Sequence, residues 1–194
     1  MQAARGTSLS LDDSSLTNSP VPSRARALGL MAAVFAVLYA ADQFTKALAV
    51  EHLSLRNDVS LVGDLLVLHL TRNAGAAFSA GTGHTEVFTF LAIIAVVVVL
   101  WLSRRLRDRT WAVAFGLLLA GICGNLTDRM VRAPGPLRGH VVDFLMLPHW
   151  PIFNVADMCI NVAAALILVQ AYRGIRLDGS RVVRHSDEPD TTSS

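Results

Sequence analysis

The sequence predicts an all-α membrane protein, a four-transmembrane-helix bundle with a small extracytoplasmic β-rich part. Of its 194 residues, 53% are hydrophobic and only 16% are charged, and the mean hydropathy is +0.46. A soluble domain usually carries about 25% charged residues. The apolar residues gather in four stretches, each close to the roughly 20 residues that cross a bilayer core, and this observation decides the class.

The four predicted spans cover about residues 28–50, 87–103, 111–129 and 153–172 and together form one domain, 28–172. Residues 1–27 are rich in Ser, Thr, Pro, Asp and Arg and show no hydrophobic periodicity, so we expect a disordered tail there. The segment 173–194 ends in the polar run "HSDEPDTTSS" and is expected to be a second disordered tail.

The first span could instead be a cleaved signal peptide. Two arginines precede its apolar core, and the tripeptide at residues 47–49, "ALA", has the A-x-A form of a cleavage site. Three polar residues, Asp42, Gln43 and Lys46, lie between that core and the cleavage site. We therefore favour a retained transmembrane helix.

Arginine placement predicts the orientation of the spans. Basic segments precede the first span, join the second to the third and follow the fourth. Their arginines are Arg24, Arg26, Arg104, Arg105, Arg107, Arg109, Arg173, Arg176, Arg181 and Arg184. Cytoplasmic loops carry such an excess of Lys and Arg. We therefore expect both termini in the cytoplasm, and the segments 51–86 and 130–151 on the outer side.

The first outer segment is predicted to contain β-structure. The run "VSLVGDLLVLHLT" (59–71) is apolar and β-prone, and the dipeptide Gly63-Asp64 in its middle is a turn signal. The run is too short for a helix to cross the bilayer. A small hairpin or sheet on the outer leaflet is therefore expected.

Composition argues against several classes of function. The formal net charge is only +2, which does not favour nucleic-acid binding. The two cysteines, Cys123 and Cys159, lie in apolar runs without a CxxC or Cys/His neighbourhood, so neither a metal site nor a disulfide framework is expected. The sequence also contains no HExxH zinc motif and no GxSxG nucleophile elbow.

Ionisable and amide side chains recur near the predicted outer ends of the spans and in the outer segments. Such groups at membrane depth are costly, so they are functional candidates by default. The candidates are Asp42, Lys46, Asn73, Asn125, Asp128, Arg129, Asp143, Asn154 and Asp157. In the last span, Asn154, Asp157 and Asn161 fall on one helical face. We expect Asn161 to form interhelical hydrogen bonds.

A purely structural role is the alternative for several of these residues. Asp42 and Lys46, four positions apart, could form an intrahelical ion pair. Asp128 and Arg129 could form a pair at the membrane boundary. Asp157 has no basic residue near it in the sequence, so its charge must be met by groups across the bundle.

The acidic candidates suggest one kind of chemistry. Two carboxyl groups that approach each other cannot both ionise freely, so one of them retains a proton to a higher pH. The ionised member can then activate water, and the protonated member can protonate a leaving group. A carboxylate pair is the only hydrolytic chemistry that these residues readily support.

Five short motifs occur in order along the predicted spans. They are Asp42-x-x-x-Lys46, "NAGAAFS" at 73–79, "GNLTDR" at 124–129, "VVDF" at 141–144 and "FNVAD" at 153–157. In this order and spacing, residues 28–172 resemble bacterial lipoprotein signal peptidase, also called signal peptidase II. The resemblance implies an intramembrane aspartyl endopeptidase that removes signal peptides from diacylglyceryl-modified prolipoproteins, cutting before the lipidated cysteine.

The resemblance also implies where the protein works and which residues act. It implies a monomer in the bacterial cytoplasmic (inner) membrane, in contact with membrane lipid, with its active site near the outer face and without a metal or cofactor. Asp143 and Asp157 are the implied catalytic pair. The implied substrate-binding residues are Asp42, Lys46, Asn73, Asn125, Arg129 and Asn154. The segment after the first span resembles the β-cradle of the family, and Asp128 is expected to support the structure.

Two other classes of function are alternatives to this one. A small transporter or proton pathway could use the same carboxylates as a relay, but a relay should place ionisable residues across the whole bilayer depth. The candidates instead cluster at the predicted outer end, and the span at 87–103 contains no ionisable residue. A structural membrane-assembly protein does not explain two aspartates in separate polar motifs.

Overall fold

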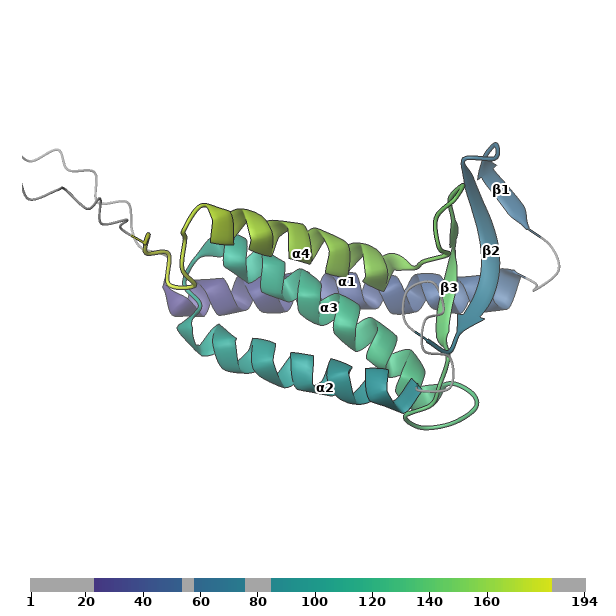
Figure 1. The fold of residues 1–194 in the computed structure, drawn as a ribbon, viewed down its shortest axis with the longest axis horizontal. Helices are drawn as coiled ribbons and strands as arrows, with labels where there is room; N and C mark the ends of the chain where they lie inside the picture. The colour runs from purple at the N-terminus through teal and green to yellow at the C-terminus, as the bar shows by residue number, and fades with distance from the viewer. Residues whose placement is uncertain (1–22, 54–57, 76–84, 183–194) are drawn as a thin grey trace, which may run out of the picture.

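The structure of the protein is a computed structural model that describes residues 23–53, 58–75 and 85–182. Its elements are, in chain order, α1 (Arg24–His52), β1 (Val59–Val62), β2 (Leu66–Asn73), α2 (Thr85–Leu102), the 3-10 helix η2 (Ser103–Arg105), α3 (Arg109–Val131), β3 (Val141–Met146) and α4 (Val155–Tyr172). Figure 1 shows the helices side by side, with the sheet across one end. We call this the sheet end, and the opposite end, where α1 begins and α4 finishes, the loop end.

Within the described ranges, four helices are long and apolar enough to cross a membrane, which confirms the predicted four-helix membrane architecture. Each helix begins and ends within about one turn of the predicted span. The largest difference is at the start of α1, where residues predicted to belong to the first tail are helical. Ser23 caps this helix, because its Oγ accepts a hydrogen bond from the backbone N of Arg26 at 3.4 Å. The remainder of the predicted N-terminal tail, 1–22, lies outside the described residues.

Helix α3 lies between α1 and α4 and approaches both of them closely. A Cβ added at Gly121 would lie 2.4 Å from the carbonyl oxygen of Ala156 in α4. A Cβ added at Gly124 would lie 2.5 Å from a carboxylate oxygen of Asp42 in α1. Because no side chain fits at these distances, the two glycines allow the helix contacts that bring polar groups of α1, α3 and α4 together.

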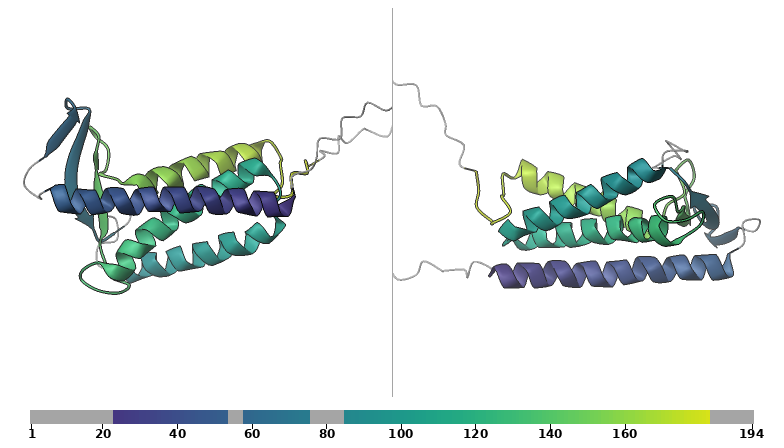
Figure 2. Two further views of the ribbon diagram at one scale, coloured as in Figure 1. Left: turned by 180° about the vertical axis from the view of Figure 1, so that it is seen from behind. Right: turned by 90° about the horizontal axis from the view of Figure 1, so that it is seen from below.

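Helix α1 is longer than its neighbours and extends to the sheet. Its 29 residues correspond to about 44 Å, whereas the hydrocarbon core of a bilayer is about 30 Å thick. Both views in Figure 2 show α1, in purple and blue, running from the loop end to the sheet. There Ala49 packs in one cluster with Leu70, Val142 and Phe144, which attaches the sheet to the bundle.

The sheet has three antiparallel strands in the order β1-β2-β3. The predicted hairpin is present, since β1 and β2 pair on either side of a turn in which Gly63 adopts a φ of 49°. The third strand, β3, was not predicted. It comes from the loop before α4, and it pairs Thr71 with Asp143 and Asn73 with Val141. This pairing places the two polar motifs "TRN" and "VVDF" side by side.

The C-terminal segment differs from the prediction of disorder from residue 173. Residues 173–182 form a compact turn, with a β-bridge between Ile175 and Arg181. The turn folds back on the bundle, because the carbonyl oxygen of Leu177 accepts hydrogen bonds from the backbone N of Arg107 at 2.9 Å and of Asp108 at 3.1 Å. The rest of the predicted tail lies outside the described residues.

Candidate active site

A cavity of about 420 Å³ lies at the sheet end, where α3, α4, β2 and β3 meet. It is lined by Asn73, Gly75, Asn125, Arg129, Val141, Asp143, Trp150, Pro151, Ile152, Phe153, Asp157, Ile160 and Asn161. Two carboxylates, three amides and one guanidinium therefore share one cavity in an otherwise apolar bundle. We call it the carboxylate cavity.

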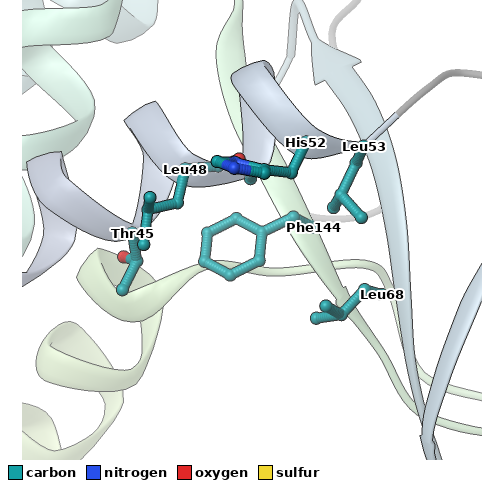
Figure 3. Close-up of a pocket in the computed structure, with 7 residues that line it drawn as sticks. Thr45, Leu48, His52, Leu53, Leu68 and Phe144 are labelled. Atoms are coloured by element: carbon teal, nitrogen blue, oxygen red, sulfur yellow. The ribbon is translucent and has the colours of Figure 1, made fainter.

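Strand alternation aims Asp143 into this cavity. Its neighbours Val142 and Phe144 point to the other face of β3, where Phe144 lines a separate apolar pocket with Leu68 and the end of α1 (Figure 3). Asp143 is 2% exposed and accepts hydrogen bonds from Nδ2 of Asn73 at 3.1 Å and Nδ2 of Asn154 at 2.6 Å.

The surroundings of Asp143 favour its protonated form. Burial, followed by the negative charge of Asp157, raises the pKa of Asp143 to about 7. The hydrogen bonds from Asn73 and Asn154 and the charge of Lys46 act in the opposite direction but do not cancel the rise. Asp143 can therefore carry a proton near neutral pH.

Asp157 is held by the first turn of α4. Asn154 is the N-cap of this helix, and the two residues form a capping box. The Oδ1 of Asn154 accepts from the backbone N of Asp157 at 3.0 Å, and the backbone N of Asn154 donates to Oδ2 of Asp157 at 3.2 Å. The other carboxylate oxygen, Oδ1, accepts from Nδ2 of Asn125 at 2.8 Å. Both oxygens of Asp157 thus have fixed donors.

Asn154 links the two acidic residues. Its amide nitrogen donates to Asp143 while its amide oxygen caps the helix at Asp157. The side chain is 0% exposed, so its orientation is set by these contacts and not by solvent. Asn154 therefore fixes the relative position of the two carboxyl groups.

A buried ionic cluster supports this arrangement from behind. Lys46 is 0% exposed and forms ion pairs with Asp42 at 3.0 Å and Asp128 at 2.8 Å. Its Nζ also donates to Oδ1 of Asn125 at 2.9 Å. With its oxygen bound to a cation, the amide of Asn125 must turn its nitrogen toward Asp157. The charge on Lys46 thus sets the direction of a hydrogen bond inside the carboxylate cavity.

Arg129 supplies a positive charge to the wall of the cavity. Its Nη2 donates to the carbonyl oxygen of Gly75 at 2.8 Å, and its guanidinium lies 6.0 Å from the centre of the Phe88 ring. The side chain is 7% exposed, and its Nη1 has no hydrogen-bond partner among the described residues. A buried donor without a partner is costly unless a ligand satisfies it.

Comparison with known protein families shows which family the chain belongs to. The family model described as Signal peptidase (SPase) II matches residues 34–173, which covers most of α1, the other three long helices and the sheet. The chain belongs to the signal peptidase II family.

Individual relatives agree with this assignment. A lipoprotein signal peptidase of Leifsonia xyli is 46% identical over 176 residues, covering 86% of this chain and 82% of the relative. One of Mycobacterium leprae is 46% identical over 153 residues, covering 79% and 76%. A bacterial membrane enzyme solved by the in meso method at 2.3 Å resolution shares the fold, with a TM-score of 0.69 at 24% identity over 80% of this chain and 95% of that one.

Six of the eight residues that the signal peptidase II resemblance singled out meet around one cavity. Asn73, Asn125, Arg129, Asp143 and Asp157 line it, and Asn154 lies directly behind it. Asp42 and Lys46 differ from the expectation of substrate contact, because both are 0% exposed and do not line the cavity. They form the intrahelical ion pair that was the structural alternative for these two residues.

Other expectations for single residues need correction. Asp128 does not pair with Arg129, and its carboxylate contacts Lys46 and Arg132 instead. Arg132, four residues after Asp128 in α3, was the signal in the sequence that was missed. Asn161 does not bridge helices, since its Nδ2 donates to the carbonyl oxygen of Asp157 within α4 and its side chain lines the cavity.

The structure adds a wall that the sequence did not reveal. The segment 150–153, between β3 and α4, forms part of the wall of the carboxylate cavity. Phe153 is fixed by backbone hydrogen bonds to Leu145, at 2.9 Å and 3.0 Å. In the part of the chain that the structure describes, no three His, Cys, Asp or Glu side chains are grouped so that they could hold a metal ion.

Proposed function

We propose that the protein is an intramembrane aspartyl endopeptidase that removes signal peptides from diacylglyceryl-modified prolipoproteins, cutting before the lipidated cysteine. Membership of the signal peptidase II family and the lipoprotein signal peptidase relatives support this substrate class. The observation that carries the proposal is that Asp143 and Asp157 line one cavity and are joined by Asn154. In this proposal the protein acts as a monomer and needs no metal ion or cofactor.

The carboxyl pair supplies both halves of acid–base catalysis. One proton is shared between the two carboxyl groups, because both line one cavity and the negative charge of Asp157 disfavours ionisation of Asp143. The ionised member removes a proton from a water molecule, whose oxygen attacks the scissile carbonyl carbon. The protonated member gives its proton to the carbonyl oxygen. When the tetrahedral intermediate collapses, the C–N bond breaks and the leaving amine takes the proton that came from water. A hydroxyl group of the intermediate returns its proton to the other carboxylate, so the pair again holds one proton.

The polar wall of the cavity binds the substrate backbone. Arg129 offers Nη1, and a carbonyl oxygen of the peptide is the acceptor that this donor lacks. Asn73, Asn125 and Asn154 orient the two carboxyl groups through their amide nitrogens. Asn73 and Asn125 also line the cavity, where they can meet the substrate, whereas Asn154 acts from behind it. Asp42 and Lys46 lie behind the cavity wall and act on it through Asn125.

The protein lies in the cytoplasmic membrane with both termini inside and the carboxylate cavity near the outer face. The arginine-rich η2 segment and the turn at 173–182 lie together at the loop end, which supports this orientation. Reporter fusions at Gly135 should therefore read as outside, and fusions at Arg107 and Arg181 as inside. A cytoplasmic reading at Gly135 would place the carboxylate cavity on the wrong side for an exported substrate.

The proposal is tested by incubating the purified protein with a diacylglyceryl-modified prolipoprotein. Loss of the signal peptide, with a new N-terminus at the lipidated cysteine, is the expected result. The same prolipoprotein without its lipid should be cut far more slowly.

Activity should persist in EDTA, because the proposed chemistry uses only carboxyl groups. Loss of cleavage in EDTA that zinc restores would rule out the aspartyl mechanism.

Activity should fall as the pH rises through about 7. The raised pKa of Asp143 means that this carboxyl group loses its proton in that range, and the pair then has no acid. Above the pKa, kcat/KM should decrease by about tenfold for each pH unit. The pH profile of kcat/KM measures this, with the Asp64→Asn variant, an exposed carboxylate at the hairpin turn, as a control that should not shift the profile. A flat profile from pH 6 to 9 would contradict the assignment.

A further inference from the structure

A second polar cavity is lined by residues from the loop end of the bundle. In Figure 1 this end, where η2 joins α2 to α3, lies opposite the sheet. The cavity has a volume of about 440 Å³ and is lined by Arg105, Trp111, Arg176, Leu177 and Asp178. The first of these belongs to η2, the second to α3 and the others to the turn at 173–182. Three separate parts of the chain thus build its walls.

The turn is fixed in its position by specific contacts. Nε1 of Trp111 donates to the carbonyl oxygen of Ile175 at 3.0 Å. The carbonyl oxygen of Leu177 accepts two backbone hydrogen bonds from the start of the α3 segment, and its side chain packs against the core cluster that contains Leu106. Because backbone and side-chain contacts both hold the turn, the fold keeps Arg176 and Arg105 in the wall of one cavity.

The cavity has a net positive charge, because two arginines and one aspartate lie in its wall. Within the described residues, neither Arg105 nor Arg176 forms an ion pair. The one acid in the wall, Asp178, is already engaged, because its Oδ1 accepts from the backbone N of Ser180 at 2.9 Å and from Oγ of Ser180 at 2.7 Å. These hydrogen bonds lower the pKa of Asp178, so its carboxylate stays ionised and stabilises the turn. Further arginines flank the cavity in the sequence, namely Arg104, Arg107 and Arg173.

We propose that this cavity binds the phosphate-containing headgroup of an anionic membrane phospholipid. The guanidinium of Arg105 lies 6.0 Å from the centre of the Trp101 ring, a contact that leaves its N–H groups able to donate in the plane of the guanidinium. A phosphodiester offers the charge and the hydrogen-bond acceptors that suit the guanidinium groups of Arg105 and Arg176. A lipid is favoured over a soluble anion because the cavity opens at the end of four membrane-crossing helices, beside a tryptophan. Tryptophan is enriched at the level of the headgroups, and basic pockets between transmembrane helices bind such headgroups.

Native mass spectrometry of the full chain in detergent tests this proposal. The protein is mixed with phosphatidylglycerol or phosphatidylcholine at equal concentrations, and the bound lipid is counted. The unmodified protein should retain phosphatidylglycerol in preference to phosphatidylcholine. The double variant Arg105→Gln/Arg176→Gln should lose this preference, by about fivefold for each arginine removed. Its cleavage activity, measured in neutral detergent, should not change, because neither arginine lies near the carboxylate cavity.

A matched control separates a binding site from general surface charge. The double variant Arg24→Gln/Arg26→Gln removes the same charge at the same end, from exposed positions on α1 that do not line the cavity. It should keep the preference for phosphatidylglycerol. An equal loss in both double variants, or an unchanged preference in the cavity variant, would overturn the proposal. Inorganic phosphate should not displace the lipid at millimolar concentration, and displacement would identify a soluble-anion site instead.

Discussion

Replacing either Asp143 or Asp157 by asparagine should reduce cleavage per folded molecule by at least about a thousandfold. Each change removes the acid or the base of the pair, and general acid–base catalysis alone contributes about 10² to 10⁴ in rate. The nucleophilic water also loses its activating carboxylate. The double variant should be hardly worse than either single variant, because residues that act as a unit are non-additive.

Both variants should fold, although each loses one hydrogen bond. Asp143 accepts one bond at each oxygen, from Asn73 and from Asn154, and an amide offers only one oxygen. Against this loss, the variant removes a charge from a site that is 2% exposed. Because the folded-state pKa of Asp143 is raised to about 7 from 3.8, its contribution to stability falls as the pH rises from about 4 to 7.

The pH dependence gives this prediction a second readout. Asp143→Asn should be at least as stable as the unmodified protein at pH 8, where the native carboxyl group is ionised and buried. At pH 5 the native group is protonated, and the advantage of the variant should disappear. Thermal unfolding in detergent at the two pH values measures this difference.

An exposed carboxylate on the same sheet provides the control. Asp64→Asn should leave both turnover and stability unchanged, since this side chain lies at the hairpin turn in solvent. The outcome that contradicts the assignment is specific. If Asp143→Asn retained near-normal turnover while Asp128→Asn abolished it in well-folded protein, then Asp128 would be the partner of Asp157.

The helices and the identity of the polar motifs could be predicted from the sequence because both are local properties. A span needs about 20 apolar residues in a row, and Gly63 marks the hairpin turn within its own segment. The strand β3 could not be predicted in the same way. Its residues lie in a loop between two spans, and they become a strand only because β2, almost 70 residues earlier, offers a free edge.

The sequence predicts most of the residues that gather at the cavity, but it does not predict which of them contact one another or which are buried behind it. Charge balance required Lys46 to meet carboxylates, but the sequence does not say which ones or how deeply they are buried. The contact between Lys46 and Asn125 depends on the close approach of α1 and α3 at Gly124, which is a tertiary property. Asn154 was expected on a helical face and is instead the N-cap of α4, because its side chain satisfies the backbone N of Asp157.

Replacing Lys46 by methionine should destabilise the protein more than any change at the surface. Lys46 is the cation for two buried carboxylates, and removing one partner of a buried ion pair costs about 3–5 kcal/mol. The two carboxylates are not affected equally. Asp128 retains its contact with Arg132, whereas Asp42 has no other ion-pair partner among the described residues. Asp42 should therefore be the source of most of the loss.

The difference between Asp42 and Asp128 can be tested with a second substitution at Asp42. In the double variant Lys46→Met/Asp42→Asn, the uncompensated charge is gone, and an amide oxygen at position 42 can still accept from the backbone N of Ala156, a bond of 2.8 Å in the native protein. Stability should recover by more than half. The matched control is Arg138→Met, which breaks the exposed ion pair with Glu86 and should cost at most about 1 kcal/mol.

Activity should not recover together with stability in the Lys46→Met/Asp42→Asn variant. Without Lys46, the amide oxygen of Asn125 keeps only the contact with Nδ2 of Asn154 at 3.2 Å, so its nitrogen is less firmly directed at Asp157. We expect kcat to remain at least about tenfold below that of the unmodified protein while KM changes little, because Lys46 is fully buried and does not touch substrate. Thermal unfolding and steady-state cleavage, measured on the same preparations, separate the two effects. Full recovery of kcat in the double variant would show that the charge on Lys46 serves only the fold. A double variant that is as unstable as Lys46→Met alone would show that Asp42 does not depend on Lys46.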